Sequence, residues 1–267
     1  MSMTFVQQAG RGADVVLVHG WGLHGGILEG LAHELMSSYR VTIVDLPGHG
    51  RSRLMPGDEL NRQSILQSLS EVTPQTATWI GWSLGGMLAM EMALTAPQRV
   101  SGLITFATSP RFVRSDDWPN AMQPEQLAGF AEQLTRDWQG TLKNFLALQM
   151  LGSDGAREHI RYLQEHMLRY GEPNRAALEC GLEILQQTDL RDRLAELQCP
   201  SLFVYGELDR LVPAAVAGDI RRLLPNAGVV VVPHAGHAPF ISHFDDAVKR
   251  IRHFLMRLAS SAGAQAS

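Results

Sequence analysis

Ser83 lies at the centre of the hexapeptide Gly-Trp-Ser-Leu-Gly-Gly, which occupies residues 81–86. The apolar run Thr78–Ile80 precedes this motif, and a stretch with helical spacing, Leu84–Ala96, follows it. A G-x-S-x-G sequence between a strand and a helix is typical of a nucleophile elbow, a sharp turn that exposes the serine hydroxyl. Its glycines let neighbouring backbones approach where a Cβ would clash. We therefore predict that Ser83 is a nucleophile; the alternative is a glycine-rich turn that serves packing alone.

A nucleophilic serine needs a general base, and that base needs a third group that orients it. Asp209 and His237 each follow a later apolar run, so the chain order is serine, acid, histidine. Because both residues come directly after expected strands, they should lie at the carboxyl ends of those strands, where ligands bind in open α/β sheets. Glu207 and His234 compete for the same two roles. We favour Asp209 as the acid and His237 as the base.

The sequence His-Gly-Trp-Gly at residues 19–22 follows the first clear strand. An early loop of this kind can donate one N–H to a developing oxyanion, and the start of the helix after the nucleophile can donate another. We predict that the backbone N–H groups of Trp21 and Leu84 form this oxyanion hole. The side chains of Trp21 and Trp82 are expected to line an acyl pocket, with plain core packing as the alternative. Asp45 also ends a strand and is interpreted as part of a structural turn.

Short apolar runs alternate with stretches of helical spacing, which predicts an α/β fold with a mostly parallel central sheet flanked by helices. The expected strands are Val15–Val18, Val41–Val44, Thr78–Ile80, Leu103–Phe106, Leu202–Tyr205 and Val229–Val232. The expected helices of this part are Ile27–Met36, Ile65–Val72, Leu84–Ala96, Val216–Leu224 and Asp245–Ala259.

The alternation stops between about Pro110 and Leu197, where strand signals are scarce. Four helices are predicted there, at Pro124–Trp138, Thr141–Leu151, Ala156–Tyr170 and Asn174–Gln187. We interpret the segment 111–197 as a helical lid over a core that comprises 1–110 and 198–259. Residues 260–267 are small and polar, and we expect a flexible tail.

Composition restricts the class of protein. The chain has 267 residues, 45% of them hydrophobic and 19% charged, and a formal net charge of −4. This balance is ordinary for a globular domain, and the lack of basic clusters argues against a nucleic-acid partner. Cys180 and Cys199 fit neither a metal pattern nor a disulfide framework. No secretory signal or run of about 20 apolar residues is evident, so we expect a soluble, cytoplasmic protein without membrane contact.

These motifs together resemble those of the α/β-hydrolase superfamily and, more closely, those of the pimeloyl-[acyl-carrier protein] methyl ester esterase family of biotin synthesis. The resemblance rests on residues 19–23, 45–48, 81–86 and 236–243, and on lid residues 145–149, 182–185 and 189–191. Lids diverge freely among hydrolases, so the matches in the lid are the more specific ones. The resemblance implies that residues 145–149 line the acyl pocket: Phe145, Leu146, Ala147, Leu148 and Gln149.

The same resemblance implies an acidic carrier protein as partner, which the family meets with arginines on its lid helices. Arg157 and Arg161 match that pattern, and Lys143 lies beside Asn144, one of two family arginine positions that differ here; the other is Gly140. Residues 111–189 contain eight Lys and Arg against twelve Asp and Glu, so docking would depend on a local basic patch. A solvated helix face is the alternative reading of Arg157 and Arg161.

The implied activity is that of a serine carboxylesterase, which hydrolyses the methyl ester of pimeloyl-acyl-carrier protein to pimeloyl-acyl-carrier protein and methanol. One alternative is a general carboxylesterase for short-chain free esters, and another is a non-catalytic ligand-binding receptor on the same scaffold. We expect a monomer. No metal or organic cofactor is expected, because a catalytic zinc takes more protein ligands than the neighbouring His234 and His237 supply.

Overall fold

The computed structural model describes residues 3–55 and 57–265 of the chain. Its strands are β1 (Val6–Gly10), β2 (Asp14–Val18), β3 (Arg40–Val44), β4 (Ala77–Trp82), β5 (Val100–Phe106), β6 (Ser201–Gly206) and β7 (Gly228–Val232). These form a seven-stranded sheet in the order β1-β3-β2-β4-β5-β6-β7. Strand β1 runs antiparallel to β3, and the other neighbouring pairs in this sheet are parallel.

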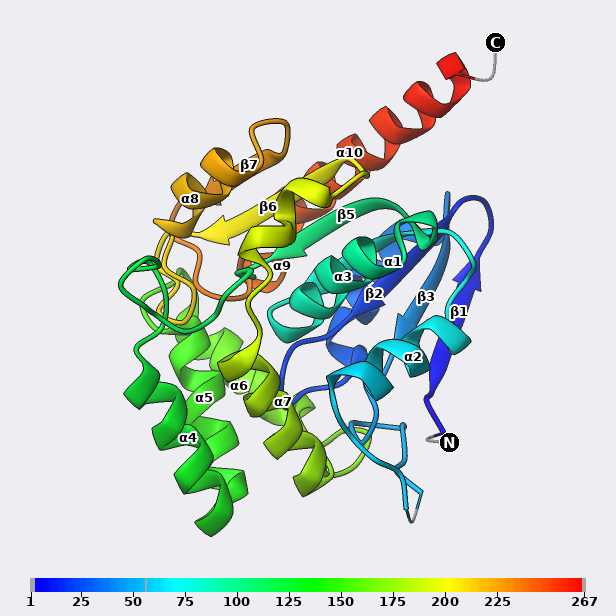
Figure 1. Cartoon of the computed structure of the whole chain (residues 1–267). Coiled ribbons are helices and arrows are strands. Elements are labelled where there is room, and N and C mark those ends of the chain that lie inside the picture. The colour runs from blue at the N-terminus through cyan, green and yellow to red at the C-terminus, as the bar shows by residue number, and fades with distance from the viewer. Residues whose placement is uncertain (1–2, 56, 266–267) are drawn as a thin grey trace.

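Helices flank the sheet, as Figure 1 shows. The α-helices are α1 (Glu29–Leu35), α2 (Arg62–Val72), α3 (Leu84–Thr95), α4 (Pro124–Arg136), α5 (Trp138–Met150), α6 (Ala156–His166), α7 (Arg175–Gln187), α8 (Val216–Leu223), α9 (Pro239–Ser242) and α10 (Phe244–Gln265). Short 3₁₀ turns occupy Gly25–Leu28, Pro97–Arg99 and Arg191–Glu196.

Helices α3 and α10 cover opposite faces of the sheet. A side chain at Gly81 would meet the start of α3 at Gly85, whereas a side chain at Gly102 would meet Leu258 of α10. Gly102 pairs with Thr78 on the neighbouring strand, three residues before Gly81. Because side chains alternate between the two faces of a strand, residues three apart point to opposite sides.

The predicted α/β fold with a mostly parallel, helix-flanked sheet is confirmed, and all six predicted strands are present. Strand β1 is an addition that nothing in the sequence signals. Its residues, Val-Gln-Gln-Ala-Gly, contain no apolar run, and four of the five are exposed. An edge strand of this kind is held by main-chain hydrogen bonds to β3, which leave no hydrophobic pattern in the sequence.

Helices α4 to α7 lie between β5 and β6 in the chain, and Figure 1 shows them gathered at one end of the sheet. We call them the lid helices. Their bounds agree with the four helices predicted for this part of the sequence to within a few residues. The division into a core at 1–110 and 198–259 and a lid at 111–197 stays a prediction. Helix α10 continues to Gln265, so residues 260–265 are helical where we expected a tail, and 266–267 lie outside the described residues.

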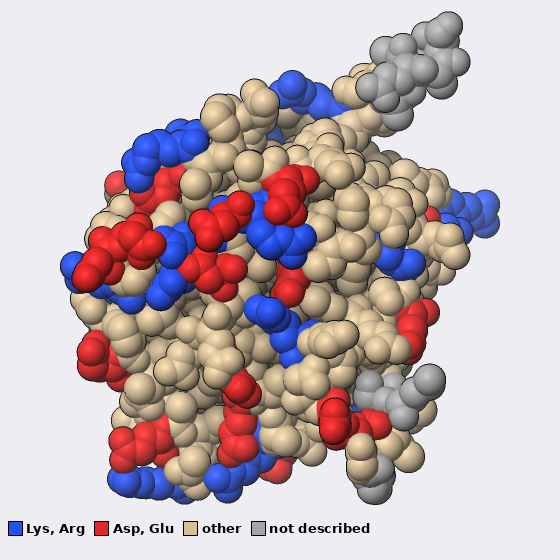
Figure 2. Space-filling view, viewed as in Figure 1, with Lys and Arg blue, Asp and Glu red and all other residues tan. Residues whose placement is uncertain are grey.

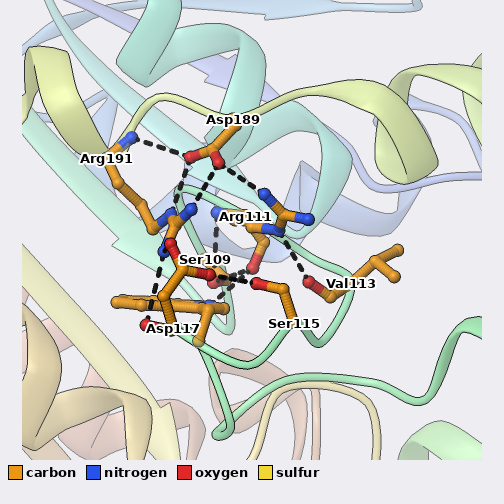
Figure 3. Close-up of polar contacts among 8 residues, drawn as sticks. Ser109, Arg111, Val113, Ser115, Asp117, Asp189 and Arg191 are labelled. Carbon is orange, nitrogen blue, oxygen red and sulfur yellow. Dashed lines mark hydrogen bonds and ion pairs between the residues drawn. The ribbon is translucent and has the colours of Figure 1, made fainter.

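The two segments that connect the lid helices to the sheet are tied to each other, as Figure 3 shows. Arg111 and Arg191 each donate to Asp189 Oδ2 at 2.7 Å. Arg191 also lies 3.0 Å from the carboxylate of Asp117. Burial alone would raise the pKa of Asp189, but the hydrogen bonds from Arg191 and Arg111 outweigh it and lower that pKa to about 2. The segments before α4 and after α7 are thus joined to each other through the carboxylate of Asp189.

A second attachment joins the far end of α6 to the core. Tyr170 donates its hydroxyl to Glu29 Oε1 at 2.7 Å, and the guanidinium of Arg51 lies 4.1 Å from the centroid of the Tyr170 ring. Nε2 of His24 is 2.8 Å from the carbonyl oxygen of His166. These contacts attach the lid helices to the core at a place separate from the Asp189 cluster.

Over the residues described, no helix has both the length and the apolar character that a membrane crossing requires.

Candidate active site

Ser83 occupies a strained turn between β4 and α3. Its φ is 54° and its ψ is −119°, a left-handed conformation that residues other than glycine adopt rarely. The turn is held because the Ser83 N–H donates to the carbonyl of Phe106 at 2.9 Å, and Thr108 Oγ1 donates to the carbonyl of Ser83 at 3.0 Å. Strain of this kind persists only where the surroundings over-determine it, and it clusters at functional sites.

The glycines of the motif are required by close backbone contacts. A Cβ on Gly81 would lie 2.5 Å from the Cα of Gly86, and a Cβ on Gly85 would collide with the carbonyl oxygens of Val18 and His19. The backbones of strand β4, helix α3 and the end of β2 are thus in direct contact, with no side chain between them. This explains why the sequence between a strand and a helix has glycine at these positions.

The structure brings Ser83, His237 and Asp209 together although they are far apart in sequence. Nε2 of His237 is 2.9 Å from Ser83 Oγ, and Nδ1 of the same ring is 2.8 Å from Asp209 Oδ2. The relative exposures are 1% for Ser83, 0% for His237 and 6% for Asp209. The three side chains therefore form one line of hydrogen bonds that is shielded from water.

The orientation of Asp209 fixes which nitrogen of His237 carries a proton. Backbone N–H groups of Leu211 and Val212 donate to Asp209 Oδ1 at 2.8 and 3.0 Å, which leaves Oδ2 for the imidazole. A carboxylate accepts hydrogen bonds and cannot donate them. Nδ1 of His237 must then be the donor, so the lone pair of Nε2 faces the hydroxyl of Ser83.

The backbone of His237 is also held on both sides. Its N–H donates to the carbonyl of Gln149, the penultimate residue of α5, at 2.7 Å. Its carbonyl accepts from Nε1 of Trp82 at 2.8 Å. A Cβ on Gly236 would lie 2.5 Å from the carbonyl oxygen of Gln149, so this loop reaches α5 only with glycine there. Neither contact was part of the sequence-based interpretation.

The two competing residues have other contacts. Glu207 Oε2 accepts from the backbone N–H of His234 at 2.9 Å, and both residues are exposed. His234 has a φ of 57°, which belongs to the turn that carries the chain toward His237. The pair Glu207 and His234 thus supports the loop, whereas Asp209 and His237 point to the serine.

Trp21 is wedged between two lid helices. Its Nε1 donates to the carbonyl of Leu178 in α7 at 2.9 Å, and its ring meets Phe145 of α5 edge-on with centroids 4.8 Å apart. The indole of Trp82 packs edge-on against Phe240 at 5.2 Å. Both indoles are therefore fixed by hydrogen bonds to carbonyls, in addition to any contact with a substrate.

The remaining predicted pocket residues differ in burial. Phe145 and Leu146 are fully buried, and Ala147 and Leu148 are partly exposed. Gln149 is buried, and its Oε1 has no hydrogen-bond partner among the described residues. A buried amide oxygen without a hydrogen-bond partner is costly to stability.

Three histidines near the site are buried. His19 donates from Nδ1 to the carbonyl of Gly20 at 2.8 Å and accepts from the N–H of Leu46 at 2.9 Å. Burial, together with the neighbouring His49, lowers the pKa of His19 to about 3, and burial lowers that of His49 to about 4. Burial also lowers the pKa of His24. These residues support the loops beside the elbow.

The predicted carrier contacts lie on the surface of the lid helices. Lys143 of α5 and Arg157 and Arg161 of α6 are exposed, and Arg161 Nε is 3.8 Å from Glu165 Oε1. Figure 2 shows that basic and acidic side chains are interspersed on the face it displays. Within the described residues, no group of three or more His, Cys, Asp or Glu side chains could hold a metal ion.

Comparison with known proteins identifies the family. A model of the alpha/beta hydrolase fold matches residues 15–244. A curated relative from Aeromonas salmonicida is 43% identical over 250 residues, which cover 94% of this chain and 98% of the relative. Another from Stenotrophomonas maltophilia is 41% identical over 260 residues, with 97% and 99% covered. Both relatives are named pimeloyl-[acyl-carrier protein] methyl ester esterase.

Solved structures show the same fold. An esterase from Exiguobacterium antarcticum has a TM-score of 0.84 at 21% identity, and a bromoperoxidase from Bacillus anthracis has 0.85 at 23%, each with 96% of both chains covered. At this identity the likeness shows the fold alone, since one fold hosts many reactions. The family model and the curated relatives go further: this chain belongs to the α/β-hydrolase fold family and, within it, to the pimeloyl-[acyl-carrier protein] methyl ester esterases.

Proposed function

We propose that this chain is a serine carboxylesterase that hydrolyses the methyl ester of pimeloyl-acyl-carrier protein, giving pimeloyl-acyl-carrier protein and methanol. The observation that carries the proposal is the continuous hydrogen-bonded line from Ser83 through His237 to Asp209. Such a line is the arrangement that activates a serine for attack on an ester. The names of the curated relatives supply the substrate.

The reaction has two halves. In the first, Ser83 Oγ attacks the ester carbonyl while His237 Nε2 takes the hydroxyl proton, and Asp209 stabilises the imidazolium. The carbon–methoxy bond then breaks, and His237 gives its proton to the departing methanol. In the second half, His237 takes a proton from water, the hydroxide forms a bond with the acyl carbon, and Ser83 leaves with the proton returned to it.

Backbone N–H groups of Trp21 and Leu84 would stabilise the oxyanion in both halves. Leu84 is the first residue of α3, and the first N–H groups of a helix have no partner within the helix. The loop with Trp21 passes beside the nucleophile, because a Cβ on Gly20 would lie 3.3 Å from the Cβ of Ser83. These two observations support Trp21 and Leu84 as the donors.

The acyl chain would lie among Trp21, Trp82 and the α5 residues Phe145 to Gln149. This set is mostly apolar, as a methylene chain requires. The unpaired Oε1 of Gln149 is a polar group in that lining. The carrier protein would remain outside, against Lys143, Arg157 and Arg161, so that the distal methyl ester reaches Ser83.

One observation favours a second candidate, a general carboxylesterase without a carrier partner. Residues 111–189 have eight basic and twelve acidic side chains, which gives the lid a net charge of the same sign as an acidic carrier. Like charges slow association unless a local patch compensates. The two candidates share the same chemistry and differ in what the lid admits.

The test is hydrolysis of methyl pimeloyl-acyl-carrier protein, free methyl pimelate and a short aryl ester, followed by mass spectrometry, with Ser83→Ala as control. We expect loss of the methyl group from the carrier-bound substrate with its thioester intact, a strong preference for that substrate, and no turnover by Ser83→Ala. Preference for the short free esters would transfer the function to the general carboxylesterase. Hydrolysis by Ser83→Ala at the native rate would contradict both.

A further inference from the structure

We infer that Gly181 of lid helix α7 is a positioning residue for the oxyanion hole. Its missing side chain lets α7 rest directly on Trp21 and Leu84, the two residues whose N–H groups form that hole under the proposed function, on which this inference rests. The lid helix then fixes the donors as well as covering the substrate.

The contact is tight on both sides of the glycine. A Cβ on Gly181 would lie 2.6 Å from Cδ1 and 3.1 Å from Nε1 of Trp21. The same atom would lie 3.3 Å from Cδ2 of Leu84. Both neighbours are buried, with relative exposures of 1% each, and buried side chains are closely packed, so a shift of either one displaces further atoms. One methyl group at residue 181 would therefore press on both donor residues at once.

The indole of Trp21 is attached to the same helix. Its Nε1 donates to the carbonyl of Leu178, which lies one turn before Gly181. Phe145 of α5 closes the other side of the ring at a centroid distance of 4.8 Å. Helix α7 thus holds Trp21 by a hydrogen bond at residue 178 and by close packing at residue 181.

The orientation of the Trp21 backbone depends on these two contacts with α7. Trp21 lies between Gly20 and Gly22, and Gly22 has a φ of 73°. Glycines restrain a backbone little, so the loop itself does not define where the Trp21 N–H points. The side chain anchored in the lid supplies that restraint, and a shift of the indole is passed to the peptide group at its base.

The presence of glycine inside α7 is otherwise unfavourable. Glycine is disfavoured relative to alanine in a helix interior. Lid helix α4 also contains a glycine, Gly129, but a Cβ there would meet nothing within 4 Å. The two positions form a matched pair: each Gly→Ala change favours its own helix, and only the one at Gly181 meets the candidate site.

The experiment compares Gly181→Ala with Gly129→Ala. Three quantities are measured: kcat, KM for a short aryl ester, and the inhibition constant of an alkyl trifluoromethyl ketone, which adds to Ser83 and places an oxyanion in the hole. Removal of one oxyanion donor costs about 10²- to 10³-fold in kcat, so a displaced donor should cost about 10- to 100-fold. We expect losses of that size in kcat and in ketone affinity for Gly181→Ala, and KM within about twofold.

Gly129→Ala should keep all three quantities within about twofold of the native chain, because nothing surrounds that position. Equal behaviour of the two variants would overturn the inference, and so would a loss for Gly181→Ala that appears in KM alone. The pH dependence of kcat should be the same as in the native chain, because neither change touches His237 or Asp209. A shifted pH dependence would instead indicate damage to the hydrogen-bonded line of Ser83, His237 and Asp209.

A second variant, Trp21→Phe, tests the inference independently if Gly181→Ala does not fold. It keeps a ring in the same place but removes the hydrogen bond to Leu178, and should weaken ketone affinity and kcat together about 5- to 10-fold. Native ketone affinity in Trp21→Phe would contradict the role of the lid. If the native chain hydrolyses no ester and binds no ketone, the proposed function fails; an active native chain with an unaffected Gly181→Ala removes this inference alone.

Discussion

The main-chain N–H of His237 donates to the carbonyl of Gln149 at 2.7 Å, so the candidate base is attached to a lid helix through its backbone. The carbonyl of the same residue accepts from the indole of Trp82, which precedes the nucleophile. The position of the imidazole is therefore defined from two directions, by α5 and by the elbow. These two hydrogen bonds can therefore affect the rate through the position of His237, apart from any contact of Trp82 or Gln149 with the substrate.

Trp82→Phe tests this attachment. The change keeps an aromatic ring but leaves the buried carbonyl of His237 without its donor, which should cost about 1–3 kcal/mol of the free energy of unfolding. We expect kcat for a short aryl ester, which lacks the long acyl chain that Trp82 is proposed to contact, to fall about tenfold while KM changes little. Trp79→Phe is the matched control, because Nε1 of Trp79 has no hydrogen-bond partner among the described residues. Equal kcat values for the two variants would show that the hydrogen bond does not position the base.

Asp209→Asn tests the acid of the proposed triad. An amide at this position can donate to Nδ1 of His237 and turn the imidazole into the wrong tautomer, and an analogous change in a serine protease costs about 10⁴-fold in kcat. We expect a loss of that order, with a folded protein by circular dichroism. Glu207→Gln, at the competing and exposed carboxylate, should stay within about twofold. A near-native rate in Asp209→Asn would transfer the role to another carboxylate.

Much of the fold could be predicted from the sequence because its signals are local. The six parallel strands are short apolar runs, and the elbow carries its glycines within six residues around Ser83. The contact among Ser83, His237 and Asp209 could be predicted because each follows a strand, and strand ends meet at one edge of a parallel sheet. Strand β1 has no such signal, since its residues are mostly exposed and bond through their main chain.

The contacts of the lid with the site could not be predicted for a different reason. Trp21 and Leu178 are 157 residues apart, and the acceptor on Leu178 is a main-chain carbonyl that any residue would supply. The same holds for the carbonyl of Gln149. The role of Gly181 could not be predicted either. A single glycine within a helical pattern indicates only a slightly less stable helix until its neighbours are known. Such contacts depend on how helices pack across the chain.

The buried histidines predict how stability depends on pH. The pKa of His19 is lowered to about 3 and that of His49 to about 4, against 6.5 in the unfolded chain. Below pH 6.5 the unfolded chain binds protons that the folded chain does not, so the free energy of unfolding falls as the pH decreases toward these values. Each histidine contributes a slope of up to about 1.4 kcal/mol per pH unit. Denaturant titrations at pH 7, 6 and 5 measure this slope.

His49→Asn should reduce that slope, because asparagine does not titrate and its amide can still donate to a backbone carbonyl. The exposed His33 on α1 provides the matched control, since its replacement removes an imidazole without opening the buried cluster. The pH range above 5 limits the contribution of carboxylates, whose ordinary pKa values are near 4. An unchanged slope in His49→Asn would mean that this imidazole is protonated in the folded chain as readily as in the unfolded one.

Arg157 and Arg161 are the residues that we predict to recognise the carrier protein. Both are exposed on α6, and exchange of both for glutamate reverses the local charge that an acidic carrier would meet. We expect kcat/KM for methyl pimeloyl-acyl-carrier protein to fall about tenfold or more at low salt, with a smaller effect at high salt because exposed charges are screened. The rate on free methyl pimelate should not change.

Arg136→Glu, at an arginine on α4 whose side chain is 77% exposed, is the control for an added acidic charge on the lid. Equal losses on the carrier-bound and the free ester would instead indicate a distorted lid, and no loss on either would assign Arg157 and Arg161 to a solvated helix face.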